Sequence, residues 1–339
     1  MPDALELIPS VKNRVDPDKW NSLLSGSPGA TVFHTLEWIR ALKAAFRGFG
    51  TKYLLVEDRS GRYVAGLPLV HDRSLLLSRY SSLPFGTYGG PVAVEGLETD
   101  VSPFLTVALQ ALTREILPFS FHCVLYNAPT ILERALQSAF PDGRRLRATT
   151  HLIDLAPGFQ ELWDSCFDKE TRTCARKALR SGLKVEERTT RETASALHRL
   201  YRGQAASWRA GRVYPARLLG AIIENMNGKA RIWTGSRGDR VLCAVLVLYF
   251  GDTLMAWLSG QDAEGRNVRA SHLVYAEIIK DACAKGLAIF NFGGSGTLEG
   301  VRFFKESFGA REFSYSVLIR EPPLFELARK VRRIALRME

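Results

Sequence analysis

The spacing of apolar and polar residues predicts helices and strands along the whole chain. In the first half, the expected helices are Val32–Phe46, Phe104–Leu117 and Ile131–Phe140, and the expected strands are Tyr53–Val56, Tyr63–Val70, Val124–Tyr126 and His151–Leu155. The segment Ser81–Pro91 is rich in turn-forming residues, yet it also contains large apolar side chains. This composition indicates a structured loop and not a linker.

The second half shows a stronger pattern. Its expected helices are Gln160–Ser181, Thr193–Arg209, Pro215–Met226 and Ser271–Lys285, and its expected strands are Leu183–Arg188, Ala230–Ser236, Val241–Phe250, Thr253–Ser259 and Phe313–Ile319. This order indicates an α+β fold, and the similar but weaker order of the first half makes an internal duplication plausible. We place the domain boundary near residues 150–157, between a domain of residues 1–150 and one of residues 151–320.

The stretch Ala288–Ala310 combines a short apolar strand, a glycine-rich turn and an amphipathic helix. A turn of this kind often presents backbone N–H groups to an anion, although a well-capped packing unit has the same pattern. The spacing of Gly294, Gly296 and Gly300 imitates a dinucleotide-binding motif, but no second βαβ half follows it. A Gly-Lys-Ser/Thr ending is also missing, so we exclude both the dinucleotide site and the P-loop.

The composition is ordinary for a globular protein, because 46% of the 339 residues are apolar and 24% are charged. The first twenty residues are too polar for a secretory signal, and the longest apolar run, Val241–Phe250, is half as long as a membrane-spanning helix. Five cysteines without Cys-x-x-Cys spacing indicate reduced core residues. We therefore expect a cytoplasmic protein, which could lie peripherally at the inner face of the membrane.

The net charge of +11 is concentrated in one segment. Residues 169–217 carry 13 basic and 4 acidic side chains. A local field of that kind favours an anionic partner such as RNA, a phosphorylated donor or an anionic lipid. A solvated helix face is the alternative explanation.

Five segments resemble the FemAB-like branch of the GNAT superfamily, which comprises peptidoglycan-bridge aminoacyltransferases and their exopolysaccharide-associated relatives. The segments are Phe33–Trp38, Leu83–Pro91, Thr171–Val185, Asn291–Ser295 and Phe303–Gly309. Since they cover both halves in order, the resemblance implies tandem domains with the GNAT (acyl-CoA N-acyltransferase) fold. Each domain would be a mixed, mostly antiparallel sheet with flanking helices, and the C-terminal helix of residues 321–339 would pack on the first domain.

The resemblance also implies an acyltransferase that moves an acyl or aminoacyl group from an activated donor onto an amine. It implies no permanently bound cofactor, because the anionic donor, aminoacyl-tRNA or acyl-CoA, is a co-substrate. The implied acceptor is a cell-envelope or polysaccharide-related amine, lipid-linked or saccharide, and DNA is not an expected partner. The chain departs from the usual CoA pyrophosphate loop at Gln261–Asn267, whose one glycine stands at a different offset.

Acyl transfer to an amine needs a proton acceptor and groups that stabilise the developing oxyanion. Lys305 follows the glycine turn by one helical turn and matches the family segment, so we expect it to be the catalytic cation and to be partly exposed. Arg302 shares its helical face, and Arg172, Arg176 and Lys177 have the spacing of a phosphate-binding row. Each of these residues could instead belong to a solvated helix face.

Further candidates for binding the donor or the acceptor lie near a cleft that we expect between the strands Thr253–Ser259 and Ala288–Phe292. Trp208, Arg212 and Tyr214 could stack on a sugar or a base, although such aromatic residues are more often core. The other candidates are Trp257, Ser259, Gly293, Gly294 and Ser295. The six histidines lack the spacing of metal ligands, so no metal site is expected.

A non-catalytic module of the same fold is the alternative function, with RNA or a membrane surface as its partner. The segment Leu324–Met338 has apolar residues on one side and several arginines around them. This pattern is compatible with an interfacial helix at an anionic membrane or with docking on the first domain, which we favour.

Overall fold

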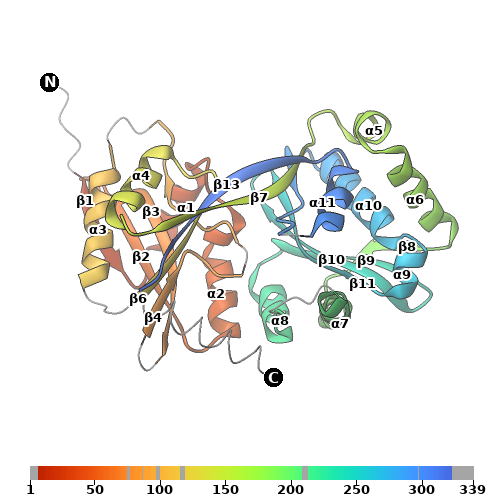
Figure 1. Ribbon diagram of the computed structural model, residues 1–339, viewed down its shortest axis with the longest axis horizontal. Coiled ribbons are helices and arrows are strands. Elements are labelled where there is room, and N and C mark those ends of the chain that lie inside the picture. Colours follow the sequence, from red (N-terminus) through yellow and green to blue (C-terminus); the bar gives the residue numbers. More distant parts are fainter. Residues whose placement is uncertain are drawn as a thin grey trace. The chain divides into compact units, whose positions relative to one another are not determined.

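In a computed structural model of the chain, the described residues are 7–74, 77–85, 87–96, 100–114, 119–207, 213–296 and 298–322. They form two compact units (Figure 1). Within the described ranges, unit 1 is drawn from Met1–Ile39, Phe46–Ala148 and Tyr315–Glu339, and unit 2 from Arg40–Ala45 and Thr149–Ser314. The predicted helix Leu324–Met338 lies outside the described residues.

Unit 1 is built on a mostly antiparallel sheet. Its strands follow the order β1 (Ile8–Lys12), β2 (Phe49–Glu57), β3 (Tyr63–Ser74), β4 (Leu77–Ser81), β6 (Phe119–Leu125) and β13 (Arg311–Arg320), and β5 (Val92–Ala93) pairs with β3. Only β4 and β6 run parallel among these described pairs. The helices of this part of the chain are α1 (Pro17–Ser25), α2 (Leu36–Ala45), α3 (Ser102–Arg114) and α4 (Thr130–Ala139), with a 3₁₀ turn at Val32–His34.

The predicted elements of the first half are present, but four further described elements were missed: β1, α1, β4 and β5. Helix α1 begins where Asp16 accepts hydrogen bonds from the backbone N–H groups of Asp18 and Lys19. Its buried residue Trp20 donates from Nε1 to the carbonyl of His34 at 2.9 Å. The short segments gave little periodicity, and their burial comes from contacts with distant parts of the chain.

Unit 2 repeats this arrangement. Its strand order is β7 (Arg144–Asp154), β12 (Ile289–Asn291), β11 (Thr253–Gln261), β10 (Arg240–Phe250), β9 (Ala230–Arg237) and β8 (Lys184–Glu187). Only β11 and β12 run parallel among the described pairs of this unit. The helices are α5 (Phe159–Glu161), α6 (Lys169–Arg180), α7 (Arg191–Ser207), α8 (Ala216–Asn225), α9 (Ala263–Asn267), α10 (Ala270–Ala284) and α11 (Glu299–Glu306), with a π turn at Leu162–Cys166.

Each unit therefore contains an antiparallel meander, one parallel pair and a final antiparallel strand. In each unit, the strand that completes this order, β13 or β7, comes from the other half of the chain. Strand β13 pairs with β6 and places Leu318 in the core of unit 1, whereas β7 pairs with β12 and places Ile153 in the core of unit 2. The structure thus confirms the α+β class.

The predicted helix Gln160–Ser181 is wrong as a single element, because the chain leaves the helical path at Phe167 and Asp168. Asp168 is extended, with φ −58° and ψ 149°, and its N–H donates to the carbonyl of Ser307 at 2.9 Å. The ring of Phe167 packs edge-on against Phe308 at 5.0 Å. Because of these contacts with residues far away in the sequence, Phe167 and Asp168 are extended, and α6 begins anew at Lys169.

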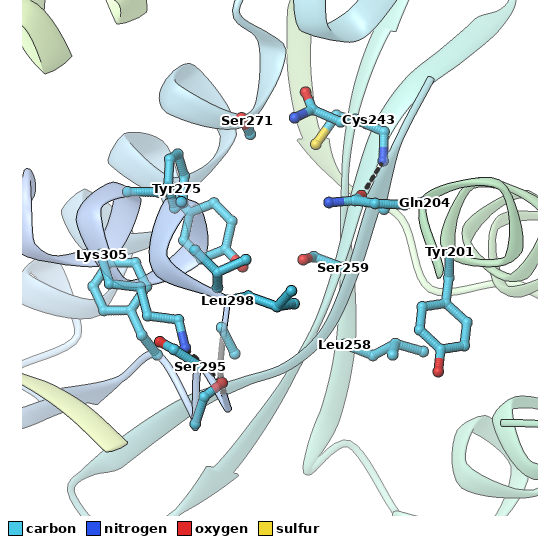
Figure 2. A pocket seen from close by; sticks show the side chains of 18 of the residues that line it. Tyr201, Gln204, Cys243, Leu258, Ser259, Ser271, Tyr275, Ser295, Leu298 and Lys305 are labelled. Atoms are coloured by element: carbon cyan, nitrogen blue, oxygen red, sulfur yellow. Dashed lines mark hydrogen bonds between the residues drawn. The ribbon is translucent and has the colours of Figure 1, made fainter. Parts of the chain in front are cut away.

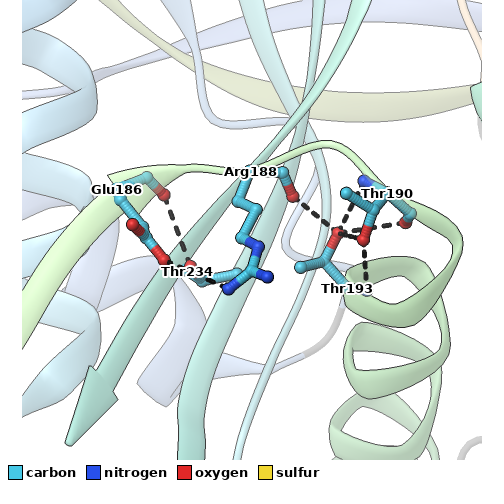
Figure 3. A network of polar contacts seen from close by, with 5 residues as sticks. All are labelled: Glu186, Arg188, Thr190, Thr193 and Thr234. Atoms are coloured by element: carbon cyan, nitrogen blue, oxygen red, sulfur yellow. Dashed lines mark hydrogen bonds and ion pairs between the residues drawn. The ribbon is translucent and has the colours of Figure 1, made fainter. Parts of the chain in front are cut away.

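A polar network fixes the start of α7 (Figure 3). The Thr193 hydroxyl accepts from the N–H of Thr190 at 2.9 Å, and the Thr190 hydroxyl accepts from the N–H of Thr193 at 3.3 Å. The Thr193 hydroxyl also donates to the carbonyl of Arg188 at 2.5 Å. This reciprocal cap ties α7 to the end of β8, so the helix has a defined position beside the sheet.

Three of the five cysteines are buried, as expected for core residues: Cys123, Cys174 and Cys243. The expectation is wrong for Cys166, which is exposed, and Cys283 is half-buried. Within the described part of the chain, no helix has the length and apolar character needed to cross a membrane.

Candidate active site

The expected cleft lies where β11 and β12 separate. The two strands pair only from Thr253 opposite Ile289 to Met255 opposite Asn291. Beyond that point β11 continues to Gln261, whereas the chain leaves β12 for the glycine turn. The sheet is therefore split along one edge of β11, and the space between the strands is a cleft of about 780 Å³.

A β-bulge in β11 lies at the same point. Val247 of β10 pairs with Ala256, and the preceding Leu246 pairs with Leu258, so Trp257 is an extra residue. A bulge bends its strand and changes the direction of its side chains. The bulge thus accounts both for the divergence of β11 from β12 and for the position of Trp257 in the wall of the cleft.

Lys305 of α11 reaches back to the glycine turn. Its Nζ donates to the carbonyls of Gly293 at 2.6 Å and Gly294 at 2.8 Å. Asn291 holds the start of the same turn, because its Oδ1 accepts from the N–H of Gly293 at 2.7 Å. Gly293 has φ +74°, which a residue with a Cβ adopts only with strain. The turn, β12 and α11 therefore form one hydrogen-bonded assembly at the floor of the cleft (Figure 2).

The expectation that Lys305 is partly exposed is wrong. The residue is only 5% exposed, and burial lowers its pKa from 10.5 to about 7. An ammonium group has three N–H bonds, of which two are directed at the turn carbonyls, so one remains for a ligand in the cleft. Lys305 can thus change its charge near neutral pH, which is unusual for a lysine.

His151 of β7 is a second buried basic group near Lys305. Its side chain is fully buried, and its Nε2 lies 3.6 Å from Oε1 of Glu306. Burial lowers the pKa of His151, and the positive charge of Lys305 lowers it further. His151 is therefore neutral at neutral pH, and Lys305 is the cation of this corner of the cleft.

Polar atoms without partners are gathered in the cleft. Among the described residues, the buried atoms Ser295 Oγ, Gln261 Oε1 and His272 Nδ1 have no hydrogen-bond partner, and all three residues line the cleft. Burial is also the main reason why the pKa of His272 is lowered to about 4. Buried polar groups normally have partners, so these atoms mark positions where a ligand would complete the hydrogen bonding.

One wall of the cleft is aromatic. Trp257 and Tyr201 line it, and Tyr214 stacks between them, with its ring parallel to Trp257 at 5.2 Å and 5.8 Å from Tyr201. Burial raises the pKa of Tyr214 to about 12, so this residue stays uncharged. On the opposite side, Figure 2 shows Tyr275 of α10 directed toward Ser259 of β11.

The structure brings part of the predicted site together. Five predicted residues line the cleft: Trp257, Ser259, Gly294, Ser295 and Lys305. Gly293 belongs to the turn below it, and Tyr214 supports Trp257 from behind. Trp208 and Arg212 lie outside the described residues.

The predicted phosphate-binding row on α6 lies away from the cleft. Nη1 of Arg172 donates to the carbonyls of Trp163, Asp164 and Phe167 at 2.9, 2.9 and 2.7 Å, which gives this residue a structural role. The guanidinium group of Arg176 lies 5.5 Å from the ring of Trp163, and Lys177 is exposed. None of these three residues belongs to the described lining of the cleft.

Arg302 also differs from its prediction. It is exposed on α11, where its guanidinium group lies over the ring of Phe303 at 5.2 Å and its Nε lies 3.7 Å from Glu306. It is not part of the described lining of the cleft. A separation of three residues predicts a shared helical face with Lys305, but on α11 Lys305 is buried and Arg302 is exposed.

Several lining residues were missed: Tyr201, Gln204, Gln261, His272 and Tyr275. Tyr275 and His272 lie in the first turns of α10, which follows β11 after the short helix α9. That position is a usable signal, because the start of a helix after a split strand faces the split. Tyr201 and Gln204 lie within the strongly polar helix α7, where the sequence offers no such signal.

The segment after β11 does not form a phosphate cradle. Asp262 caps the short helix α9, because its Oδ1 accepts from the N–H of Gly265 at 2.7 Å. A carboxylate thus accepts from an N–H group that a cradle would offer to an anion. This finding agrees with the unusual glycine offset in Gln261–Asn267.

Unit 1 has the corresponding parallel pair, β4 and β6, but a loop covers it. After β4, the N–H of Ser82 donates to the carbonyl of His122 at 2.8 Å, and the Ser82 hydroxyl accepts from the N–H of Val124 at 2.9 Å. Further along the loop, Tyr88 stacks on Tyr126 at 4.3 Å. The loop therefore lies against β6 at the place that corresponds to the open edge in unit 2, which confirms that this segment is a structured loop.

Comparison with known families identifies the domain around the cleft. Residues 166–306 match the model of the acetyltransferase (GNAT) domain family. This range contains β8 to β12, the glycine turn and Lys305. Unit 2 is thus similar to GNAT acetyltransferase domains over most of its length. None of the curated protein sequences matches the chain.

Solved structures show the same fold over nearly the whole chain. The crystal structure of FemX has a TM-score of 0.67 at 14% identity and covers 94% of this chain and 99% of that chain. A tandem GNAT protein from the clavulanic acid biosynthesis pathway has a TM-score of 0.58 at 13% identity and covers 94% and 98%. The C-terminal domain of a putative lysylphosphatidylglycerol synthetase from Agrobacterium fabrum has a TM-score of 0.57 at 13% identity and covers 92% and 93%.

These comparisons confirm the tandem GNAT-like fold, and FemX is among the solved structures that share it. The domain match supports acyl transfer in general as the activity of unit 2. Within the described residues, no group of three histidine, cysteine or acidic side chains could hold a metal ion.

Proposed function

We propose that unit 2 transfers an acyl or aminoacyl group from an activated donor, aminoacyl-tRNA or acyl-CoA, onto an amine of a cell-envelope or polysaccharide-related acceptor. The observation that carries the proposal is the split between β11 and β12 with the buried Lys305 at its floor. Among the described residues, no strand pairs with this edge of β11 beyond Met255, and an extended donor can hydrogen-bond to such an edge.

Lys305 has the central role in this proposal. Its third N–H would stabilise the negative charge that develops on the donor carbonyl or on the leaving group. Ser295 would hydrogen-bond to the same region of the donor, since its buried hydroxyl lacks a partner among the described residues. The aromatic wall of Tyr201 and Trp257 offers flat apolar faces on which a sugar ring or base of a substrate can pack.

One structural neighbour supports the aminoacyl form of the proposal through its name. The synthetase domain is named for lysylphosphatidylglycerol, a lipid that carries an amino acid. The tandem GNAT protein, whose structure is described as solved without acetyl-CoA, supports the acyl-CoA form. The donor therefore has to be identified by experiment.

The test incubates the purified protein with radiolabelled aminoacyl-tRNAs and, separately, with acyl-CoA esters, each with a panel of amino sugars and lysine-containing peptides. We expect transfer of label from one donor class and a loss of about 10²–10³-fold in rate in Lys305→Met. Arg302→Met is the matched control, because this residue lies on the same helix but outside the cleft. Equal loss in both variants, or transfer from neither donor class, would contradict the proposal.

A further inference from the structure

A second groove lies beside the cleft in unit 2. It has a volume of about 800 Å³ and is formed by α7, by the turn between β9 and β10, and by α9. Gln261, at the end of β11, lines both the groove and the cleft. A ligand that extends along β11 past Gln261 therefore enters the groove.

Four arginines give the groove its chemistry: Arg199, Arg237, Arg240 and Arg266. Arg237 and Arg240 face each other across the β9–β10 turn. Arg240 forms ion pairs with Asp262 at 2.6 Å and Glu264 at 2.9 Å, and Arg237 also pairs with Glu264. These carboxylates hold the two guanidinium groups at the groove while leaving some of their five N–H donors for another partner.

The other two arginines have no carboxylate partner among the described residues. Arg199 projects from α7, and Nη1 of Arg266 makes only a long contact of 3.4 Å with the carbonyl of Gln261. The acidic side chains in the lining are Asp239 and Asp262, and the second is already bound to Arg240 and to the start of α9. The arginines outnumber the carboxylates, and planar guanidinium groups match the geometry of phosphate oxygens.

Given the proposed donor chemistry, we propose that this arginine groove binds phosphate groups of the nucleotide portion of the donor. Activated acyl donors carry such phosphates at one end and the reactive carbonyl at the other. With the carbonyl beside Lys305, the chain of the donor would follow the open edge of β11 and pass Gln261. The groove then supplies the anion recognition that the backbone after β11 does not supply, because Asp262 already accepts from the N–H of Gly265. Asp262 also lines the groove, where its charge is balanced by Arg240.

Direct binding tests the proposal with two probes. Adenosine 3′,5′-bisphosphate represents the nucleotide end of CoA, and a short RNA hairpin that ends in CCA represents the acceptor end of tRNA. We expect the full-length protein to bind one of them, and we expect Arg199→Gln combined with Arg266→Gln to weaken that binding by tenfold or more, about the value of one charge-assisted hydrogen bond. The preferred probe identifies the source of the phosphate.

Arg191→Gln is the matched control. It removes one positive charge from the same helix, α7, at an exposed position that pairs with Glu224 and lies outside the groove. The proposal is overturned if neither probe binds, if the double variant binds as tightly as the unchanged protein, or if Arg191→Gln weakens binding as much. Both groove arginines are exposed, so an unchanged thermal midpoint will show that the double variant is folded.

The outcome is separate from the test of acyl transfer. If the double variant keeps the donor KM of the unchanged enzyme, the groove assignment fails while the proposed function stands. If a phosphate probe binds through these arginines but no donor is turned over, the groove stands and the proposed function fails.

Discussion

The charge of Lys305 should control the pH dependence of transfer. Burial lowers its pKa to about 7, so the ammonium form is about 90% populated one pH unit below that value and about 10% populated one unit above it. The proposed role requires the charged form. The contribution of Lys305 to the rate should therefore fall about tenfold between about pH 6 and pH 8.

The assay measures kcat/KM from about pH 5.5 to pH 9 for the unchanged enzyme and for Lys305→Met, with whichever donor class is accepted. The ratio of the two values is the informative quantity, because titration of the acceptor amine affects both enzymes equally and cancels. We expect the ratio to be about 10²–10³ at the acid end and to decline through a pKa of about 7.

Loss of the two hydrogen bonds to Gly293 and Gly294 will also disturb the turn in Lys305→Met. That effect lowers the rate at every pH and does not change the slope of the ratio. A ratio that is flat across the range would refute the electrostatic role and leave Lys305 as a structural residue. A ratio that rises with pH would instead show that neutral Lys305 accepts a proton from the acceptor amine.

Three further predictions concern single substitutions. Ser295→Ala should lower kcat/KM about tenfold and leave the thermal midpoint unchanged or higher, since the buried hydroxyl lacks a partner among the described residues; a large loss of stability with normal activity would contradict this. Arg172→Gln should destabilise the fold by about 1.5–3 kcal/mol in urea denaturation, because three backbone carbonyls lose their donor, and Lys177→Gln on the same helix is its control, with little change expected. Gly260→Ala should lower the free energy of unfolding by about 1–3 kcal/mol and reduce donor binding. The reason is that the added Cβ would lie 2.4 Å from the backbone N of Tyr201 and push α7 away from β11. An unchanged free energy of unfolding would show that α7 can shift freely.

The sequence by itself determined the local elements of this protein. Apolar periodicity located the meander β9–β11, helix α10 and the strand–turn–helix unit at Ala288–Ala310. The glycine turn was identified because a strand, a turn that needs a positive φ and a helix follow within a short distance, whereas Lys305 was chosen by its resemblance to a family segment. These features depend on neighbours in the sequence, which explains why they could be predicted.

The tertiary structure decided which polar side chains face the cleft. Arg172 and Lys305 both look like surface cations in the sequence, yet distant carbonyls hold the first as a structural donor and the second as a buried group. The same limit applies to the helix that breaks at Asp168, where a contact with Ser307 outweighs local helix propensity.

The pairing of β7 and β13 with strands from the other half of the chain shows most clearly what the sequence alone could not determine. The sequence predicted that β7 and β13 are strands, but their partners, β12 and β6, lie far away along the chain. The bulge at Trp257 likewise arises from the register between β10 and β11. Periodicity reports whether a position is buried, whereas pairing, register and the lowered pKa of Lys305 depend on what buries it, and that is fixed only when distant segments meet.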